Sequence, residues 1–186
     1  EGQRWRDRRR KVQPAFRTQR VRDYAATAAG HAERLCARFE RDAARDGVTV
    51  NTDAVMARLT LDIATGTLFS AEPLANGDDV ERAIQVLSDT AFHESTAPFV
   101  LPDWLPLPSK ARKRQAMALM DRVVGGLVRR RIVDDPGDRG DLLSMLVEQH
   151  RGEHTPVRDD AMSLLIAGHE TSGALLSWLF LVLVQF

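Results

Sequence analysis

The residues best suited to chemistry lie in the longest apolar run of the sequence, residues 161–186. In its middle this run carries Ala-Gly-His-Glu-Thr-Ser, at positions 167–172. If the run is a helix, five of its residues fall on one stripe that is small in the middle and bulky at both ends: Leu164, Ala167, Gly168, Thr171 and Leu175. A flat ligand can lie against the small middle of this stripe, where a larger side chain would hold it away.

Two polar residues accompany the stripe. The hydroxyl of Thr171 is placed to bond the carbonyl of Ala167, four residues earlier, and to loosen the helix locally. Glu170 lies beside the stripe in apolar surroundings, where burying a carboxylate is costly unless it has partners. That cost favours a functional role for Glu170. The alternative is a core helix in which both residues are simply a satisfied polar pair.

Two other interpretations of this run are less favourable. About 20 apolar residues are enough to cross a bilayer, but His169 and Glu170 would then lie near its centre, where ionisable groups are rare and expensive. We therefore expect no membrane span within this chain. A zinc-protease motif would need a histidine at position 173, and the sequence has Gly173 there.

Composition sets broad limits on the class of protein. The 186 residues include 26 Lys and Arg and 26 Asp and Glu, so no overall field draws the chain to nucleic acid or to an acidic membrane. The single cysteine, Cys36, suits a reducing compartment, and we expect a cytoplasmic protein. The chain begins without Met and stops inside its most apolar run, so we interpret it as an internal fragment of a single domain, residues 1–186.

The first residues form the one strongly basic segment. Trp5 and Arg9 share a helical face, with Arg6 and Arg10 on the next face round. An indole N–H and a guanidinium can together hold one buried anionic group. Two alternatives remain, a solvated helix face and a nucleic-acid patch, although the segment lacks the interleaved aromatic residues typical of the latter.

The rest of the chain has the periodicity of helices, and the predicted fold class is all-α. Pro98, Pro102, Pro106 and Pro108 interrupt it with an apolar connection that is either a lid over a greasy site or an ordinary packed loop. One short strand is predicted at 48–50, and Cys36 is expected on the core side of its helix. The expected helices cover residues 24–45, 53–69, 80–91, 109–132, 141–150 and 157–186.

Taken together, both ends of the chain resemble the cytochrome P-450 (haem-thiolate monooxygenase) family. Residues 167–172 are similar to its oxygen-binding helix motif, and residues 2–16, with Gly-x-x-Trp-Arg, Arg-Arg and Pro-Ala-Phe, to its C helix. Residues 56–63, Met-Ala-Arg-Leu-Thr-Leu-Asp-Ile, resemble its E helix. The resemblance implies a partial cytochrome P-450 fold, with an F/G-like roof at 79–133 and an I-helix-like segment at 157–186. It also implies that the N-terminal part and the haem-ligand part are missing.

The resemblance also implies roles for residues of the apolar run. Thr171 would assist the protonation of bound dioxygen, and Glu170 would take part in proton delivery. Ala167 and Gly168 would flank the haem. The implied activity is insertion of one atom of dioxygen into a mainly apolar organic substrate. The alternative is a helical ligand-binding or regulatory domain without catalysis.

At the other end, Trp5 and Arg9 would hold a haem propionate. Arg6 and Arg10 would face an acidic redox partner, either a ferredoxin, a flavodoxin or a reductase domain. The axial cysteine of the family belongs to a loop well after the oxygen-binding helix. Cys36 lies on an early helix and is not expected to be that ligand, so this chain alone is expected to be inactive.

Overall fold

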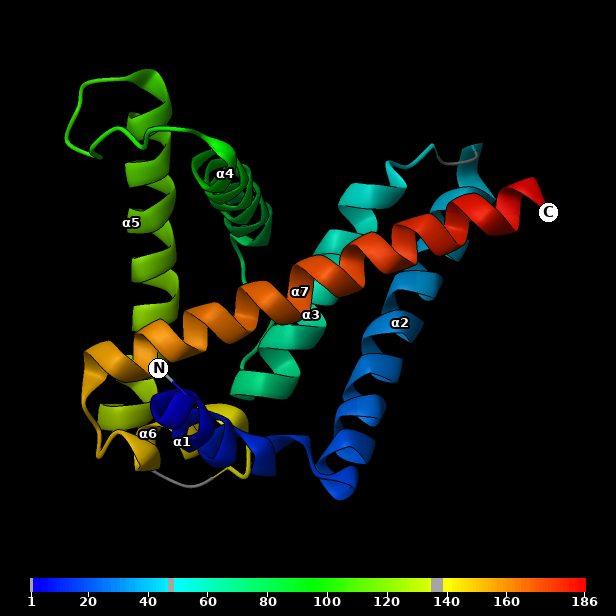
Figure 1. Cartoon of the computed structure of the whole chain (residues 1–186). Helices are drawn as coiled ribbons and strands as arrows, with labels where there is room; N and C mark the ends of the chain where they lie inside the picture. The colour runs from blue at the N-terminus through cyan, green and yellow to red at the C-terminus, as the bar shows by residue number, and fades with distance from the viewer. Residues whose placement is uncertain (1, 47–48, 135–138) are drawn as a thin grey trace.

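The computed structural model describes residues 2–46, 49–134 and 139–186, and every regular element in those ranges is a helix (Figure 1). The elements, in chain order, are α1 (Gly2–Val12), the short 3-10 helix η1 (Gln13–Phe16), α2 (Thr18–Asp46), α3 (Thr52–Phe69), α4 (Gly77–Thr96), α5 (Pro108–Arg129), the π-helical turn η2 (Arg130–Asp134), α6 (Leu142–Gln149) and α7 (His154–Gln185).

Helix α3 lies at the centre and packs against α2, α4, α6 and α7. It begins where the Asn51 side chain accepts a hydrogen bond from the Ala54 N–H at 3.2 Å, and it ends at Ser70 in the left-handed conformation. Its buried threonines are satisfied within the helix; Thr65, for example, donates to the Leu61 carbonyl at 2.7 Å. The helix can therefore be buried on several faces although it carries polar side chains.

Helices α4 and α5 pack against each other, and in Figure 1 they stand above the first half of α7. Their connection, residues 97–107, exposes Phe99 and Trp104. Ion pairs join this connection to both helices. Lys110 and Lys113 of α5 each contact Glu94 of α4 and Asp103 of the connection at 2.6–3.0 Å. The hydrogen bonds from the two lysines lower the pKa of both carboxyl groups.

A buried arginine joins three elements on the other side of the core. Arg131 donates to both carboxylate oxygens of Asp141, at 2.6 and 2.8 Å, and to the Phe69 carbonyl at 3.0 Å. Asp141 also caps α6 by accepting from the Ser144 N–H at 2.8 Å. Burial alone would raise the pKa of Asp141, but the Arg131 and Ser144 hydrogen bonds hold it below its usual value. This network ties the end of α3 to η2 and α6.

Several details differ from the sequence-based expectations. Thr49 and Val50 form no strand, and Val48 lies outside the described residues. Helix α5 begins at Pro108 rather than at residue 109, because proline suits the first helical turn, where no N–H donor is needed. For the same reason Pro156 is tolerated in the first turn of α7, which begins at His154 rather than at 157. Cys36 is exposed and not on the core side of α2.

Among the described residues, α7 alone is long and apolar enough to cross a membrane by length and composition. The core helix of a water-soluble protein satisfies the same criteria. In α7, Val157, Ala161 and Leu165 are fully buried in the protein core. The apolar second half of α7 is largely exposed, and the expected absence of a membrane span stays a prediction.

Candidate functional site

One face of α7 is buried at every fourth residue, by Val157, Ala161, Leu165, His169 and Gly173. Such a row forms a ridge along a helix, and its last part packs on α3. A Cβ atom at Gly173 would lie 3.1 Å from Thr60 Oγ1 and 3.3 Å from Ala57 Cα. The glycine therefore allows the close approach of the two helices.

His169 fixes this contact with a buried hydrogen bond. Its Nδ1 lies 3.0 Å from Thr60 Oγ1, and that hydroxyl is also 3.0 Å from the Met56 and Ala57 carbonyls. When Thr60 donates its single proton to one of these carbonyls, His169 carries its proton on Nδ1. Burial lowers the pKa of His169, opposed by the nearby Glu170 charge, so the neutral ring is favoured in the fold.

The candidate stripe lies beside this ridge and is more exposed, although its Leu164 packs partly against the core. Ala167, Gly168 and Thr171 are all exposed. A Cβ atom at Gly168 would meet only Leu68 Cδ1, at 4.0 Å. Thr171 Oγ1 donates to the Ala167 carbonyl at 2.9 Å, which confirms the predicted hydrogen bond. The middle of the stripe is therefore small and open.

Glu170 differs from the expectation, because it is exposed and not buried. The reason is its place on α7, which turns its side chain away from the core at the residue after His169. Its partner is Ser88 of α4, whose Oγ donates to Glu170 Oε2 at 2.8 Å. Ser88 and Thr60 were not predicted from the sequence. Ser88 is 82 positions from Glu170 and Thr60 is 109 positions from His169, and no local sequence pattern relates residues so far apart.

The N-terminal candidates lie on α1, which packs against α6. Arg6, Arg9 and Arg10 are exposed, and the side chain of Trp5 lies outside the described part of the structure. The grouping of Trp5 with Arg9 as an anion-binding pair therefore stays a prediction.

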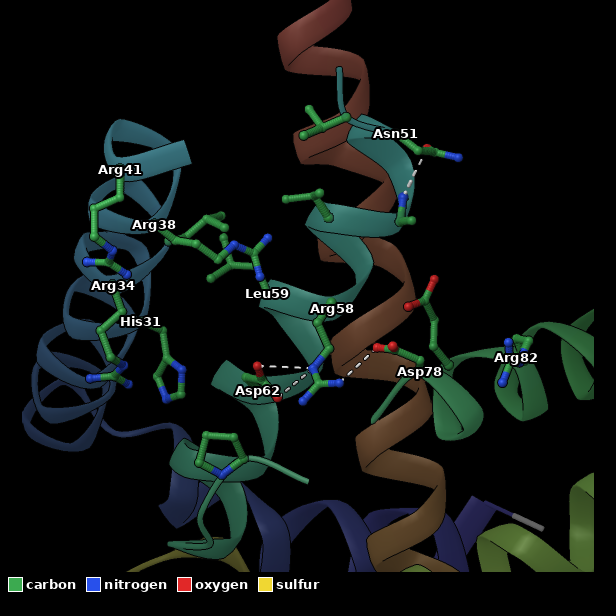
Figure 2. A pocket seen from close by; sticks show the side chains of 16 residues that line it. His31, Arg34, Arg38, Arg41, Asn51, Arg58, Leu59, Asp62, Asp78 and Arg82 are labelled. Atoms are coloured by element: carbon green, nitrogen blue, oxygen red, sulfur yellow. Dashed lines mark hydrogen bonds and ion pairs between the residues drawn. The ribbon is translucent and has the colours of Figure 1, made fainter. Parts of the chain in front are cut away.

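A separate cleft of about 680 Å³ opens between α2, α3 and α4 (Figure 2). Its lining residues come from these helices and their connections, and none comes from α7. Figure 2 shows Arg34, Arg38 and Arg41 along α2 on one wall, and Arg58 of α3 on the other.

Arg58 is engaged in holding the fold together. Its guanidinium donates to Asp62 at 3.1 Å, to Asp78 at 2.9 Å and to the Leu74 carbonyl at 2.8 Å. Gly77 leaves room for it, because a Cβ there would lie 2.3 Å from the Arg58 Cζ. Asp62 is thus a partnered structural carboxylate, and we assign this wall of the cleft to the joining of α3 and α4.

Comparisons with known proteins show the family of the chain. The family model for cytochrome P-450 matches residues 1–185. The chain is 30% identical over 182 residues to the cyclooctat-9-en-7-ol 5-monooxygenase of Streptomyces melanosporofaciens, covering 92% of this chain and 38% of that protein. It is 29% identical over 202 residues to the chloroplastic protein LUTEIN DEFICIENT 5 of Arabidopsis thaliana, covering 98% of this chain and 34% of that protein.

A solved structure shows the same fold. The crystal structure of a mutant cytochrome P-450 haem domain superposes with a TM-score of 0.71 at 25% identity, covering 97% of this chain and 40% of that one. The chain thus spans about 40% or less of the length of these relatives. Its all-α arrangement is part of their fold, and the chain belongs to the cytochrome P-450 family.

Proposed function

We propose that the protein containing this chain is a haem-dependent monooxygenase, which inserts one atom of dioxygen into a mainly apolar organic substrate. Family membership supports the class of enzyme, and the stripe on α7 supports the place of the site. The activity is proposed for the whole cytochrome P-450 domain rather than for this chain alone, because the chain spans only part of its relatives.

One observation carries the proposal. Glycine inside a helix costs about 1 kcal/mol relative to alanine. At Gly173 close packing against α3 explains the missing side chain, but at Gly168 a Cβ atom would make only an ordinary contact, with Leu68 Cδ1 at 4.0 Å. The described residues therefore leave room beside Gly168, and a flat ligand lying on the stripe would use that room.

The residues present fit one face of a haem. Ala167 and Gly168 would lie against the ring, and the exposed Thr171 hydroxyl would stand beside it. Haem, when bound, supplies an iron centre that reduces dioxygen. The chain supplies small side chains that admit the ring, a hydroxyl that can hold a proton at Oγ1, and the Glu170 carboxylate, which can exchange protons with solvent.

Further roles belong to the same proposal. Trp5 and Arg9 would bind a haem propionate, and the axial thiolate would come from a cysteine other than Cys36, which is exposed on α2. Arg6 and Arg10, both exposed on α1, would receive an acidic redox partner. A cytoplasmic location is proposed from the single cysteine.

Haem titration of position-168 variants tests the proposal. Gly168→Leu should weaken haem binding by about tenfold or more, because the side chain fills the small middle of the stripe, while Gly168→Ala should weaken it less, since a methyl group fills only part of that space. Ser163→Leu adds the same apolar bulk at another exposed position of α7 and serves as the control. Equal affinities for Gly168→Leu and Ser163→Leu would contradict a haem lying on this stripe.

A further inference from the structure

A side-chain hydrogen bond links α4 to the candidate site. Ser88 Oγ donates to Glu170 Oε2 at 2.8 Å, although the residues are 82 positions apart. Helix α4 packs mainly against α5 and α3, so its placement is set largely by helices other than α7. The bond therefore transmits the position of α4 to one carboxylate on α7.

The neighbours of Glu170 do not otherwise orient it. His169 turns into the protein towards Thr60, and the Thr171 hydroxyl donates back to the Ala167 carbonyl. Glu170 itself is exposed, and a free glutamate side chain has several accessible rotamers. The Ser88 hydroxyl selects among these rotamers. It is fixed on a different helix, and its hydrogen bond to Glu170 Oε2 forms only over a narrow range of Oγ–Oε2 distances.

We propose that Ser88 is a positioning residue for the Glu170 carboxylate, so that the placement of α4 determines where this carboxylate receives and releases protons. The inference rests on the proposed function of Glu170 in proton delivery. Ser88 keeps its own proton: it only donates a hydrogen bond to Oε2. The protons that Glu170 passes on come from solvent water, and each is replaced from solvent after transfer.

The bond also makes the carboxylate sensitive to movement of α4. A hydrogen bond at 2.8 Å is lost when the donor and acceptor separate beyond about 3.5 Å. A displacement of α4 by roughly 1 Å therefore suffices to release Glu170. The Glu170 carboxylate is therefore held by Ser88 only while α4 keeps the position that it has in this structure.

The first test uses the haem-free protein. Infrared difference spectra between the unchanged protein and Glu170→Gln isolate the carboxylate bands of Glu170. Ser88→Ala should shift these bands, because a donor to Oε2 is lost. The matched control is Ser95→Ala on the same helix, where the hydroxyl donates only to the Phe92 carbonyl. Bands unchanged in Ser88→Ala, or shifted equally in Ser95→Ala, would overturn the proposal whether or not the protein binds haem.

The second test uses the haem-loaded protein and its pH profile of product formed per reducing equivalent consumed. Ser88→Ala should lower this yield by about two- to tenfold, the effect of one lost hydrogen bond, and change the pH profile. Ser88→Thr, which keeps the hydroxyl, should restore both. In a Glu170→Gln background Ser88→Ala should have no further effect. A full effect of Ser88→Ala in that background would show that Ser88 does not act through Glu170.

Discussion

The buried ridge and the exposed stripe lie on different faces of α7, and their residues have different contacts. On the ridge, each small or polar residue has a partner in the described chain: Gly173 admits α3, and His169 bonds Thr60. On the stripe, a Cβ at Gly168 would make one ordinary contact, with Leu68, and Thr171 bonds the Ala167 carbonyl of its own helix. The difference teaches that packing accounts for the residues of one face, whereas the other face has room for the ligand that we propose.

The largest expected contrast concerns bulky residues of α7. Leu165 is fully buried, whereas Leu175 is 69% exposed. Leu165→Ala should lower the free energy of unfolding by about 2–5 kcal/mol, because it leaves a cavity in the core. Leu175→Ala should change it by less than about 0.5 kcal/mol. Denaturant unfolding of the two variants measures this contrast, and equal losses would mean that the two faces are not distinct.

A matched pair of glycines sharpens the comparison. Gly173→Ala should cost about 1–3 kcal/mol of unfolding free energy, because the new Cβ presses on the backbone of α3. Gly168→Ala should instead stabilise the haem-free protein by up to about 1 kcal/mol through helix propensity. Thermal and denaturant unfolding check both signs. Destabilisation by Gly168→Ala would show that the new methyl group clashes, contrary to its ordinary 4.0 Å contact with Leu68 Cδ1.

The free energy of unfolding should also depend on pH, through His169 on the buried ridge. Burial lowers the pKa of His169 in the fold, below an unfolded value of about 6.5. The folded protein then binds fewer protons than the unfolded chain, so stability falls as the pH drops through 6.5 towards the folded pKa. His169→Gln should remove part of this slope.

The control for this prediction is His31, whose pKa is also lowered, by burial and by Arg34. His31 is only half-buried, so His31→Gln should remove less of the slope than His169→Gln. Measuring unfolding free energy between about pH 5 and 7 for both variants decides the comparison. A slope unaffected by His169→Gln would contradict a neutral, buried ring.

Much of this organisation could be predicted from local pattern. Helical spacing predicted the stripe and the Thr171 bond to the Ala167 carbonyl, because both depend on residues within one or two turns. The partners Ser88 and Thr60 could not be predicted, since they depend on how α4 and α3 cross α7. Glu170 was wrongly expected to be buried, because an apolar sequence does not show which face of a helix is covered.

The most direct test of the central claim is the coupling of product formation in a Thr171 variant of the haem-loaded protein. Thr171→Ala removes the exposed hydroxyl but keeps the small stripe, so haem and substrate should still bind and reducing equivalents should still be consumed. Product per reducing equivalent should fall roughly five- to tenfold, with hydrogen peroxide rising to match, whereas Thr171→Ser should retain most of the coupling. Unchanged coupling in Thr171→Ala would contradict the account, because Thr171 would then be only a surface residue of α7.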